Sequence, residues 1–396
     1  MNKKFLDLGI QPLANKYLLK KKKLTKSKNN FYKLEVSFNT KTKLVSLNNK
    51  IPVKKMFDNH YPYRSSMSLT MINSFKNLAI KINQNFNPRK ILEIGSNDGA
   101  LIQNFNRERV ICVEPCGNLA KITKKKGYLT YSNYWNTDLS NKIKRKFNSV
   151  DLIYAANTIT HIDNLSNVFK SITNILSKNG VLIIEDPSLL ECINKNSYDQ
   201  FYNEHIYLFS AISVKNILKN HNLELFNIEK LVTHGGSLRY FIKRIKNKTI
   251  KIDKSVNKQI KKELKNKLDK FQTYLNFQKK VKLSKLALEK ILKTLKLSNK
   301  TIIGYGSTAK ATTILNYCKI DNTIIDYFVD TTPDKANKYI PGTNIIVKKY
   351  NKKYIKPSHY IFLGAWNFKT EIFNKEKNFI KKGGKFITHI PFPKII

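Results

Sequence analysis

The segment at residues 198–210 holds the densest group of side chains that could do acid–base chemistry. Tyr202, Glu204 and His205 stand within four residues of one another. They offer a hydrogen-bond donor, a group that could orient a base, and a proton acceptor, and an imidazole with a pKa of about 6.5 suits a general base. The segment follows an apolar strand that ends near Pro187, which places it beyond the carboxyl edge of a sheet, where such sheets bind ligands. From these residues alone, catalysis by His205 and a purely structural histidine both remain open.

Two glycine turns could hold anionic groups. The turn at residues 93–99 follows an apolar strand, and backbone N–H groups at such a strand-to-helix turn face an anionic ligand. About twenty residues on, Glu114 suits the two hydroxyls of a ribose. The strand-borne Glu93 and the missing G-x-G-x-x-G pattern favour S-adenosylmethionine (SAM) over a dinucleotide. The predicted cofactor-binding residues are Glu93, Gly95, Asn97, Gly99, Glu114 and Asn157.

The second turn, GYGSTAK at residues 304–310, matches a dinucleotide fingerprint only as G-x-G-x-x-A, which is a weak signal. Lys310 would stand at a helix N-terminus and could meet a phosphate there. A tight strand-to-helix turn explains the same residues. A further glycine turn, THGGSLR at residues 233–239, places His234 just before a strand and could equally be a hairpin turn.

Short apolar strands alternate with helices and therefore predict an α/β fold with mostly parallel sheets. We expect two Rossmann-like units joined by helices and preceded by a small, irregular N-terminal domain, called the lid below, with a basic run at Lys20 to Lys23. A helix is expected to start at Ala100. The predicted divisions are a lid at 1–70, a core at 71–243, Lys-rich connecting helices at 244–298 and a C-terminal domain at 299–396. The predicted strands lie at 32–38, 43–47, 91–94, 110–114, 150–155, 181–185, 238–242, 301–306, 324–330, 360–363 and 385–387, and predicted helices at 68–85 and 166–177.

The composition narrows the functional classes. The chain has 396 residues and a net charge of +46, carried mostly by Lys spread along its whole length. Because Lys, Asn and Ile share AT-rich codons, genome bias explains this charge better than a selected polyanion surface, and no basic stripe interleaved with aromatics supports nucleic-acid binding. No apolar run approaches the ~18–20 residues of a membrane helix. Four cysteines form no disulfide framework, so we expect a reducing cytoplasm.

Taken together, the motifs resemble the C-methyltransferases that act on nucleotide-linked deoxysugars. The agreement runs in order from about residue 8 to 393, through segments 12–18, 61–66, 92–99, 113–115, 202–205, 233–239, 305–310, 315–318, 329–343 and 365–372. The resemblance implies a class I methyltransferase Rossmann-like core, a C-terminal Rossmann-like domain and an N-terminal lid. It implies methyl transfer from SAM to a sugar carbon next to a ketone. It implies His205 as the base beside Tyr202 and Glu204, with an N-terminal tyrosine at Tyr61 or, preferably, Tyr63. His234 or a tyrosine would stabilise the oxyanion. Substrate contacts would come from Gly236, Ser237, Arg239, Lys310 and Asn316.

One departure from the family concerns zinc. Family lids carry two cysteine pairs that hold zinc, whereas Asn39 and Thr42 stand in the thiolate positions of one pair here. Neither side chain can replace a thiolate, so we predict no structural metal and a lid held by packing. The alternative functions are a methyltransferase directed to oxygen or nitrogen, a basic nucleic-acid-binding protein and a scaffold that has lost activity.

Overall fold

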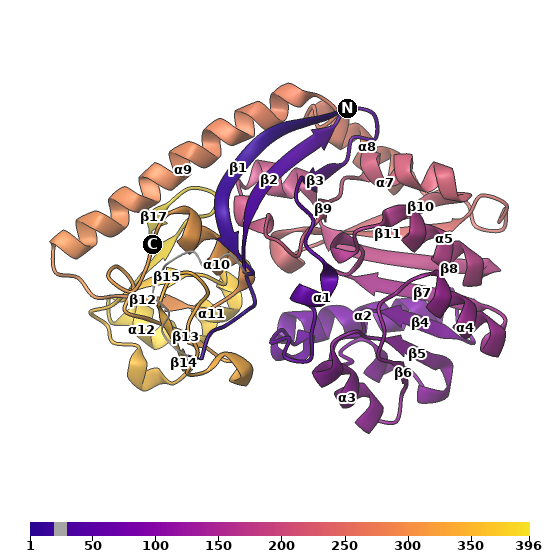
Figure 1. The fold of residues 1–396 in the computed structure, drawn as a ribbon, viewed down its shortest axis with the longest axis horizontal. Helices are drawn as coiled ribbons and strands as arrows, with labels where there is room; N and C mark the ends of the chain where they lie inside the picture. Colours follow the sequence, from indigo (N-terminus) through magenta and orange to yellow (C-terminus); the bar gives the residue numbers. More distant parts are fainter. Residues whose placement is uncertain (20–29) are drawn as a thin grey trace.

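The computed structural model describes residues 1–19 and 30–396, so the basic run Lys20 to Lys23 lies outside the described residues. The described chain forms three sheets (Figure 1). A core with a seven-stranded sheet stands beside a C-terminal body with a six-stranded sheet, and a four-stranded N-terminal sheet lies between them under a long helix. No helix in the described ranges is long and apolar enough to cross a membrane.

The seven-stranded sheet has the order β10-β11-β8-β7-β4-β5-β6. Its strands from β8 to β6 are parallel, and β11 pairs antiparallel with β8. This is the strand order and direction of a class I methyltransferase. The strands are β4 Ile91–Ile94, β5 Val110–Val113, β6 Leu129–Tyr131, β7 Val150–Ala156, β8 Leu176–Pro187, β10 Leu223–Leu231 and β11 Ser237–Arg244.

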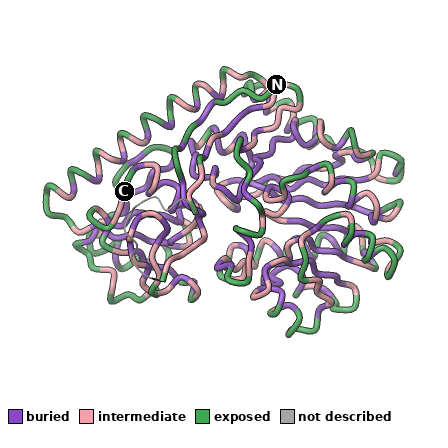
Figure 2. Tube along the Cα trace, in the orientation of Figure 1, coloured by how far each residue is buried: buried purple, intermediate pink, exposed green. Residues whose placement is uncertain are grey.

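Both faces of this sheet are covered, which explains why its central strands are apolar throughout. Alternate residues of β4 enter two separate clusters: Leu92 and Ile94 pack on one face, and Ile91 packs on the other. The same pattern repeats in β5, β7 and β8, and Figure 2 shows the sheets as the most buried parts of the chain. The helices around the core are α2 Leu69–Asn85, α3 Gly117–Lys125, α4 Thr137–Phe147, α5 Leu165–Ile175, α6 Leu189–Asn194 and α7 Ala211–Leu218.

The prediction of a helix that starts at Ala100 is wrong. Residues 100–105 form a turn and a short 3-10 helix, η2 Ile102–Asn104. The Asn104 side-chain amide donates to the carbonyls of Ala100 at 3.2 Å and Leu101 at 2.8 Å. Because that amide takes carbonyls that a continuing helix would use, the helix stops after one turn.

The C-terminal sheet has the order β14-β13-β12-β15-β16-β17 and is parallel except for β17. It is a second Rossmann-like unit, as expected. Its strands are β12 Ile302–Tyr305, β13 Tyr327–Asp330, β14 Ile346–Lys349, β15 Tyr360–Leu363, β16 Lys385–Thr388 and β17 Lys394–Ile395, with helices α10 Ala309–Tyr317, α11 Lys369–Lys375 and α12 Lys377–Lys381.

The N-terminal residues are more regular than their sequence suggests. β1 (Asn2–Pro12) pairs with β2 (Phe31–Asn39), followed by β3 (Val45–Leu47) and the short helix α1 (Val53–Met56). Apolar alternation in the sequence does not predict β1, because two register shifts break that alternation. The fourth strand, β9 (Tyr207–Leu208), comes from the core and begins two residues after His205. The candidate catalytic segment is therefore part of the N-terminal sheet.

The connecting residues form α8 (Lys254–Lys265) and the 27-residue helix α9 (Phe271–Leu297), which runs from the core to the C-terminal body (Figure 1). α9 covers the N-terminal sheet: the ring of Tyr274 stacks on Phe38 at 4.4 Å and packs against Phe5 at 5.0 Å. One apolar cluster joins this sheet, α9 and the C-terminal sheet. Packing thus holds the lid in place.

Candidate active site

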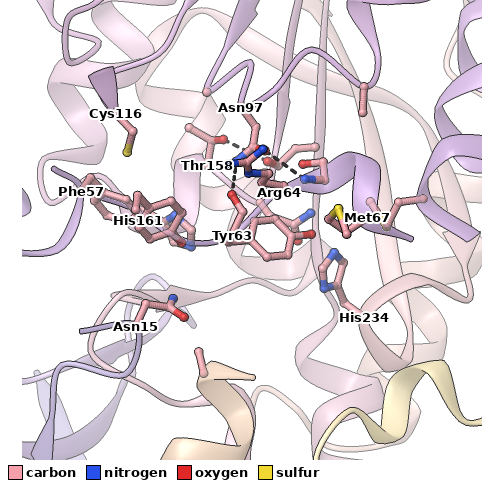
Figure 3. A pocket seen from close by; sticks show the side chains of 18 of the residues that line it. Asn15, Phe57, Tyr63, Arg64, Met67, Asn97, Cys116, Thr158, His161 and His234 are labelled. Atoms are coloured by element: carbon pink, nitrogen blue, oxygen red, sulfur yellow. Dashed lines mark hydrogen bonds between the residues drawn. The ribbon is translucent and has the colours of Figure 1, made fainter. Parts of the chain in front are cut away.

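A cavity of about 570 Å³ opens at the carboxyl edge of the core sheet, where the N-terminal segment and the C-terminal body meet it. Figure 3 shows side chains from all along the N-terminal and core sequence converging on it, among them Asn15, Tyr63 and His234. Ten of the predicted site residues line this one cavity: Tyr63, Glu93, Gly95, Asn97, Glu114, Asn157, Tyr202, His205, His234 and Lys310.

The first glycine turn forms a polar cradle. Gly95 has a φ of +74°, and a Cβ there would lie 2.2 Å from Oγ1 of Thr158, so only glycine fits. Oε2 of Glu93 and Oδ1 of Asn157 are buried and have no hydrogen-bond partner among the described residues. Such orphaned atoms in a cavity call for a polar ligand. Burial, with Glu114 nearby, raises the pKa of Glu93 well above its usual value.

The carboxylate of Glu114 already accepts two backbone hydrogen bonds, from N–H of Asn97 and of Cys116, both at 2.8 Å. These bonds pin the glycine turn to the end of β5 and leave further lone pairs of the carboxylate facing the cavity. The cradle fits SAM: Glu93 and Asn157 offer acceptors to its amine and hydroxyls, and the buried Trp135 adds an apolar wall.

Tyr202 and His205 form a hydrogen-bonded pair in the same cavity. Nε2 of His205 lies 2.5 Å from the Tyr202 hydroxyl, and Nδ1 lies 2.8 Å from the carbonyl oxygen of Gln200. A carbonyl can only accept, so we assign the imidazole hydrogen to Nδ1, and the Nε2 lone pair accepts from Tyr202. Burial, with His161 and Lys310 nearby, lowers the pKa of His205 well below its usual value. The pair therefore holds a neutral base and a protonated phenol.

His161 is a site residue that sequence reasoning missed. Its ring lies between two others, 5.2 Å from His205 and 5.1 Å from Phe57, in stacked geometry. Its Nε2 has no hydrogen-bond partner among the described residues, and burial lowers its pKa to about 3. It follows β7, four residues after Asn157, so its place beyond the carboxyl edge was the signal that could have found it.

Glu204 points away from His205. Its carboxylate accepts from the Tyr61 hydroxyl at 2.8 Å and from the Asn15 amide at 2.8 and 3.0 Å, so it ties the lid to the catalytic segment. Burial raises its pKa to about 7, although those hydrogen bonds act in the opposite direction. Tyr61 and Tyr63 both line the cavity, and burial raises the pKa of Tyr63 to about 12.

His234 also faces the cavity, from a left-handed backbone position with a φ of 52°. Its carbonyl accepts from the Gln200 side chain at 2.7 Å, and its Nε2 has no partner among the described residues. Burial lowers its pKa to about 3, so it stands ready as a neutral hydrogen-bonding group.

The remaining predicted residues are not among the described residues that line the cavity: Gly99, Glu204, Gly236, Ser237, Arg239 and Asn316. Arg239 is buried and paired with Glu185 at 3.0 Å and Glu229 at 2.9 Å, which leaves its charge committed inside the core. The amide of Asn316 donates to backbone carbonyls of Thr312 and Pro341.

Three of these residues, Gly99, Gly236 and Ser237, belong to glycine turns and contact other protein groups instead of the cavity. Ser237 donates to the carbonyl of Thr233 at 3.0 Å. A Cβ at Gly236 would lie 2.9 Å from Cγ of Glu191, and one at Gly99 would lie 3.2 Å from Thr123. Short-range sequence patterns do not distinguish such packing glycines from glycines that approach a ligand.

The C-terminal body contributes cations. Lys310 is 7% exposed and lines the cavity, and burial lowers its pKa while Asp199 partly offsets that effect. At the end of β13, Asp330 accepts from N–H of Ser307 and of Thr332, both at 2.8 Å, and pairs with Lys335 at 3.3 Å.

At Asn39 and Thr42, the positions of the family's zinc thiolates, the structure has a simple turn. Oδ1 of Asn39 accepts from N–H of Lys41 and Thr42, at 3.0 and 2.8 Å, and closes the loop between β2 and β3. Across residues 1–19 and 30–396, no three His, Cys, Asp or Glu side chains are grouped to hold a metal ion. The absence of structural zinc stays a prediction.

The chain is similar to known methyltransferases. Residues 63–228 match the family described as methyltransferase domain, and residues 232–391 match the C-methyltransferase C-terminal domain. The chain is 26% identical over 308 residues to the C-methyltransferase NovU of Streptomyces niveus, across 77% of this chain and 73% of NovU. Solved structures that it resembles include SAM-dependent methyltransferases of Thermotoga maritima (17% identity, 43% of this chain and 88% of that one, TM-score 0.33) and Clostridium acetobutylicum (15%, 44% and 92%, 0.33).

The fold and the cavity define a class I methyltransferase that uses SAM. The chain is a SAM-dependent C-methyltransferase enzyme, in which a region matching the methyltransferase domain is followed by one matching the C-methyltransferase C-terminal domain.

Proposed function

We propose that this enzyme methylates a carbon next to the ketone of a nucleotide-linked deoxy keto-sugar. The observation that carries the proposal is the neutral Tyr202–His205 pair, which shares one cavity with the cofactor cradle and with Lys310 of the C-terminal body. A carbon acid needs an unprotonated base, and a nucleotide diphosphate needs a cation. The division proposed for the chain is a lid at 1–70, a core at 71–243, connecting helices at 244–298 and a C-terminal domain at 299–396 that binds the nucleotide.

His205 takes the proton from the sugar carbon at Nε2, while Nδ1 keeps its hydrogen on the Gln200 carbonyl. Because Nε2 has a single lone pair, the Tyr202 hydroxyl turns from Nε2 to the ketone oxygen of the bound sugar before the proton is taken, and it then donates to the enolate oxygen that forms. Burial raises the pKa of Tyr202 well above its usual value, which keeps it protonated for this task. Tyr63 and His234 face the same space and are further donors to the oxyanion. When bound, SAM supplies the electrophilic methyl group that the carbanion attacks.

Two measurements test the proposal. Calorimetric titration with S-adenosylhomocysteine (SAH) is expected to show micromolar-range binding, and NAD, the control, is expected not to bind. With SAH bound, nucleotide-linked keto-sugars incubated in deuterium oxide are expected to exchange the proton next to the ketone, because the base works without methyl transfer.

The variant His205→Asn is expected to abolish that exchange while keeping SAH affinity. His221→Asn is the matched control, since this half-buried histidine packs on Phe169 outside the cavity. Exchange that persists in His205→Asn would contradict the assigned base. Exchange that is absent in the wild type with every keto-sugar tested would contradict the substrate class.

We also infer that the enzyme works in the cytoplasm. All four cysteines are buried and unpaired, as a reducing compartment allows.

A further inference from the structure

A buried carboxylate joins the catalytic segment to the C-terminal body. Asp199 lies on the short helix η5 (Tyr198–Gln200), six residues before His205, and is fully buried. Its Oδ2 accepts from Nε1 of Trp366 at 2.6 Å and from Nε2 of His389 at 3.0 Å. Both partners belong to the C-terminal body, and none of the proposed chemistry uses them. We call these three residues, Asp199, Trp366 and His389, the clamp.

The clamp also contacts the turn at residues 233–235, which carries His234. A Cβ on Gly235 would lie 2.2 Å from Cη2 of Trp366, so the outer edge of the indole lies tightly against the backbone next to His234. Gly235 has a φ of +86°, and both this conformation and this close approach require glycine. One tryptophan therefore contacts both segments that carry candidate catalytic histidines.

Gln200, the neighbour of Asp199, carries the contact onward. Its carbonyl accepts from Nδ1 of His205 at 2.8 Å, and its side-chain amide donates to the carbonyl of His234 at 2.7 Å. The Gln200 carbonyl determines which imidazole nitrogen of His205 carries the hydrogen. Anything that fixes the backbone at residues 199 and 200 fixes the tautomer and the ring orientation of His205.

We propose that the clamp is a positioning device through which the docked C-terminal body holds His205 in its Nδ1–H tautomer, ready to accept a proton at Nε2. Asp199, Trp366 and His389 touch no reacting atom in this scheme, so they are positioning residues. The catalytic consequence rests on the proposed role of His205, whereas the tautomer itself can be observed without turnover. The clamp gives the C-terminal body a task beyond nucleotide binding.

The test is an NMR measurement on the full chain, labelled with ¹⁵N-histidine and saturated with SAH. Long-range proton–nitrogen spectra distinguish the two tautomers and the charged form, and His205→Asn assigns the signal. The wild type is expected to show His205 as Nδ1–H. In Asp199→Asn, whose neutral amide oxygen accepts more weakly from Trp366 and His389 than a carboxylate oxygen, and in Trp366→Phe, which keeps an aromatic ring but loses the N–H, the signal is expected to become a mixture of forms.

The same variants are expected to lower kcat about ten- to a hundredfold while the Kd of SAH stays within about twofold, because misplacing a base costs rate and leaves the cofactor cradle intact. Tyr327→Phe is the control: it removes one hydrogen bond, to the carbonyl of Tyr354, elsewhere in the C-terminal body. If Asp199→Asn does not fold, Trp366→Phe carries the test.

A wild-type His205 signal and wild-type kcat in a folded Trp366→Phe or Asp199→Asn variant would overturn the proposal, even if the melting temperature fell. A wild type that methylates no keto-sugar would count against the proposed substrate, and the tautomer comparison would still decide the clamp.

Discussion

Burial sets the protonation state of the groups around the cavity. It lowers the pKa of His205 and raises the pKa of Tyr202 and Glu93, so both imidazole and phenol are neutral at physiological pH and Glu93 holds its proton longer than a surface carboxyl would. A neutral, dry pair suits proton abstraction from carbon, because the base does not have to shed water or a proton first.

The low pKa of His205 predicts the shape of the pH–rate profile. The acidic limb of kcat/KM for the sugar is expected well below pH 6.5, since His205 remains unprotonated to lower pH than a free imidazole. Steady-state rates at saturating SAM between pH 4.5 and 8.5 give this limb, with SAH binding measured over the same range to separate loss of cofactor. A limb at or above pH 6.5 would contradict the assignment of His205.

The raised pKa of Glu204 predicts that the stability of the fold depends on pH. Its pKa is about 7 in the folded protein against 4.5 for an unperturbed glutamate, so the folded state keeps a proton that the unfolded chain releases. The stability from this group is complete below pH 4.5 and is lost as pH rises through about 7, by at most roughly 3 kcal/mol. In urea unfolding, the free energy of unfolding of Glu204→Gln is expected to rise relative to that of the wild type as the pH increases from 5 to 8.

Glu108→Gln is the control for this comparison, because Glu108 is exposed on a core loop. A difference between Glu204→Gln and the wild type that does not change with pH would show that Glu204 titrates normally.

At the residue scale, the sequence predicted the groups that lie within one short segment or at a strand end. His205, Glu93 and Asn157 were found because their types and their places at the carboxyl edge agree. The contacts that decide their roles come from far along the chain: Glu204 meets Asn15, 189 residues away, and Arg239 meets Glu185, 54 residues away. Spacing carries no information about such pairs, so the orientation of Glu204 and the core ion pair of Arg239 could not be predicted.

At the scale of elements, most strands and the helices α2, α5, α8 and α9 followed from apolar runs and helical spacing, because parallel strands buried on both faces are unmistakable. β9 is the instructive exception. With two residues and no flanking pattern of its own, it exists because β3 presents an edge to it. The candidate catalytic segment is therefore shaped by β3 of the N-terminal sheet, which no local pattern in residues 198–210 predicts.

Lys310, on helix α10, is predicted to affect binding of the sugar without affecting binding of the cofactor. Lys310→Met is expected to raise KM for the nucleotide-linked sugar about ten- to a hundredfold, as losing one charged hydrogen bond of about 1.5–3 kcal/mol implies, while the Kd of SAH stays unchanged. Lys310 lines the cavity from the C-terminal body, whereas the cofactor cradle belongs to the core. Steady-state kinetics and calorimetry measure the two quantities.

Lys381→Met, an exposed lysine at the end of α12, controls for the loss of one charge from a basic protein. An equal KM change in both variants would mean that general charge, and not the place of Lys310, attracts the substrate.

At the scale of the whole molecule, the charge of +46 favours any anion, and its consequence depends on where the cations lie. Lys310 and Lys335 are buried at the cavity, whereas the exposed lysines are spread over the surface. Buried cations are screened little by salt, but long-range attraction from the surface falls once the Debye length shrinks from about 10 Å at 0.1 M to about 3 Å at 1 M.

Salt therefore separates the enzymatic role of the charge from a polyanion-binding role. Raising KCl from about 0.05 to 0.5 M is expected to increase KM for the nucleotide-linked sugar severalfold by removing long-range attraction, with the Kd of the zwitterionic SAH nearly constant. Binding of a DNA duplex, followed by fluorescence anisotropy, is expected to disappear by physiological salt, because scattered lysines neutralise few phosphates at once. DNA binding that stayed tight at physiological salt, together with a KM indifferent to KCl, would show that the surface charge serves a nucleic-acid partner and not the substrate.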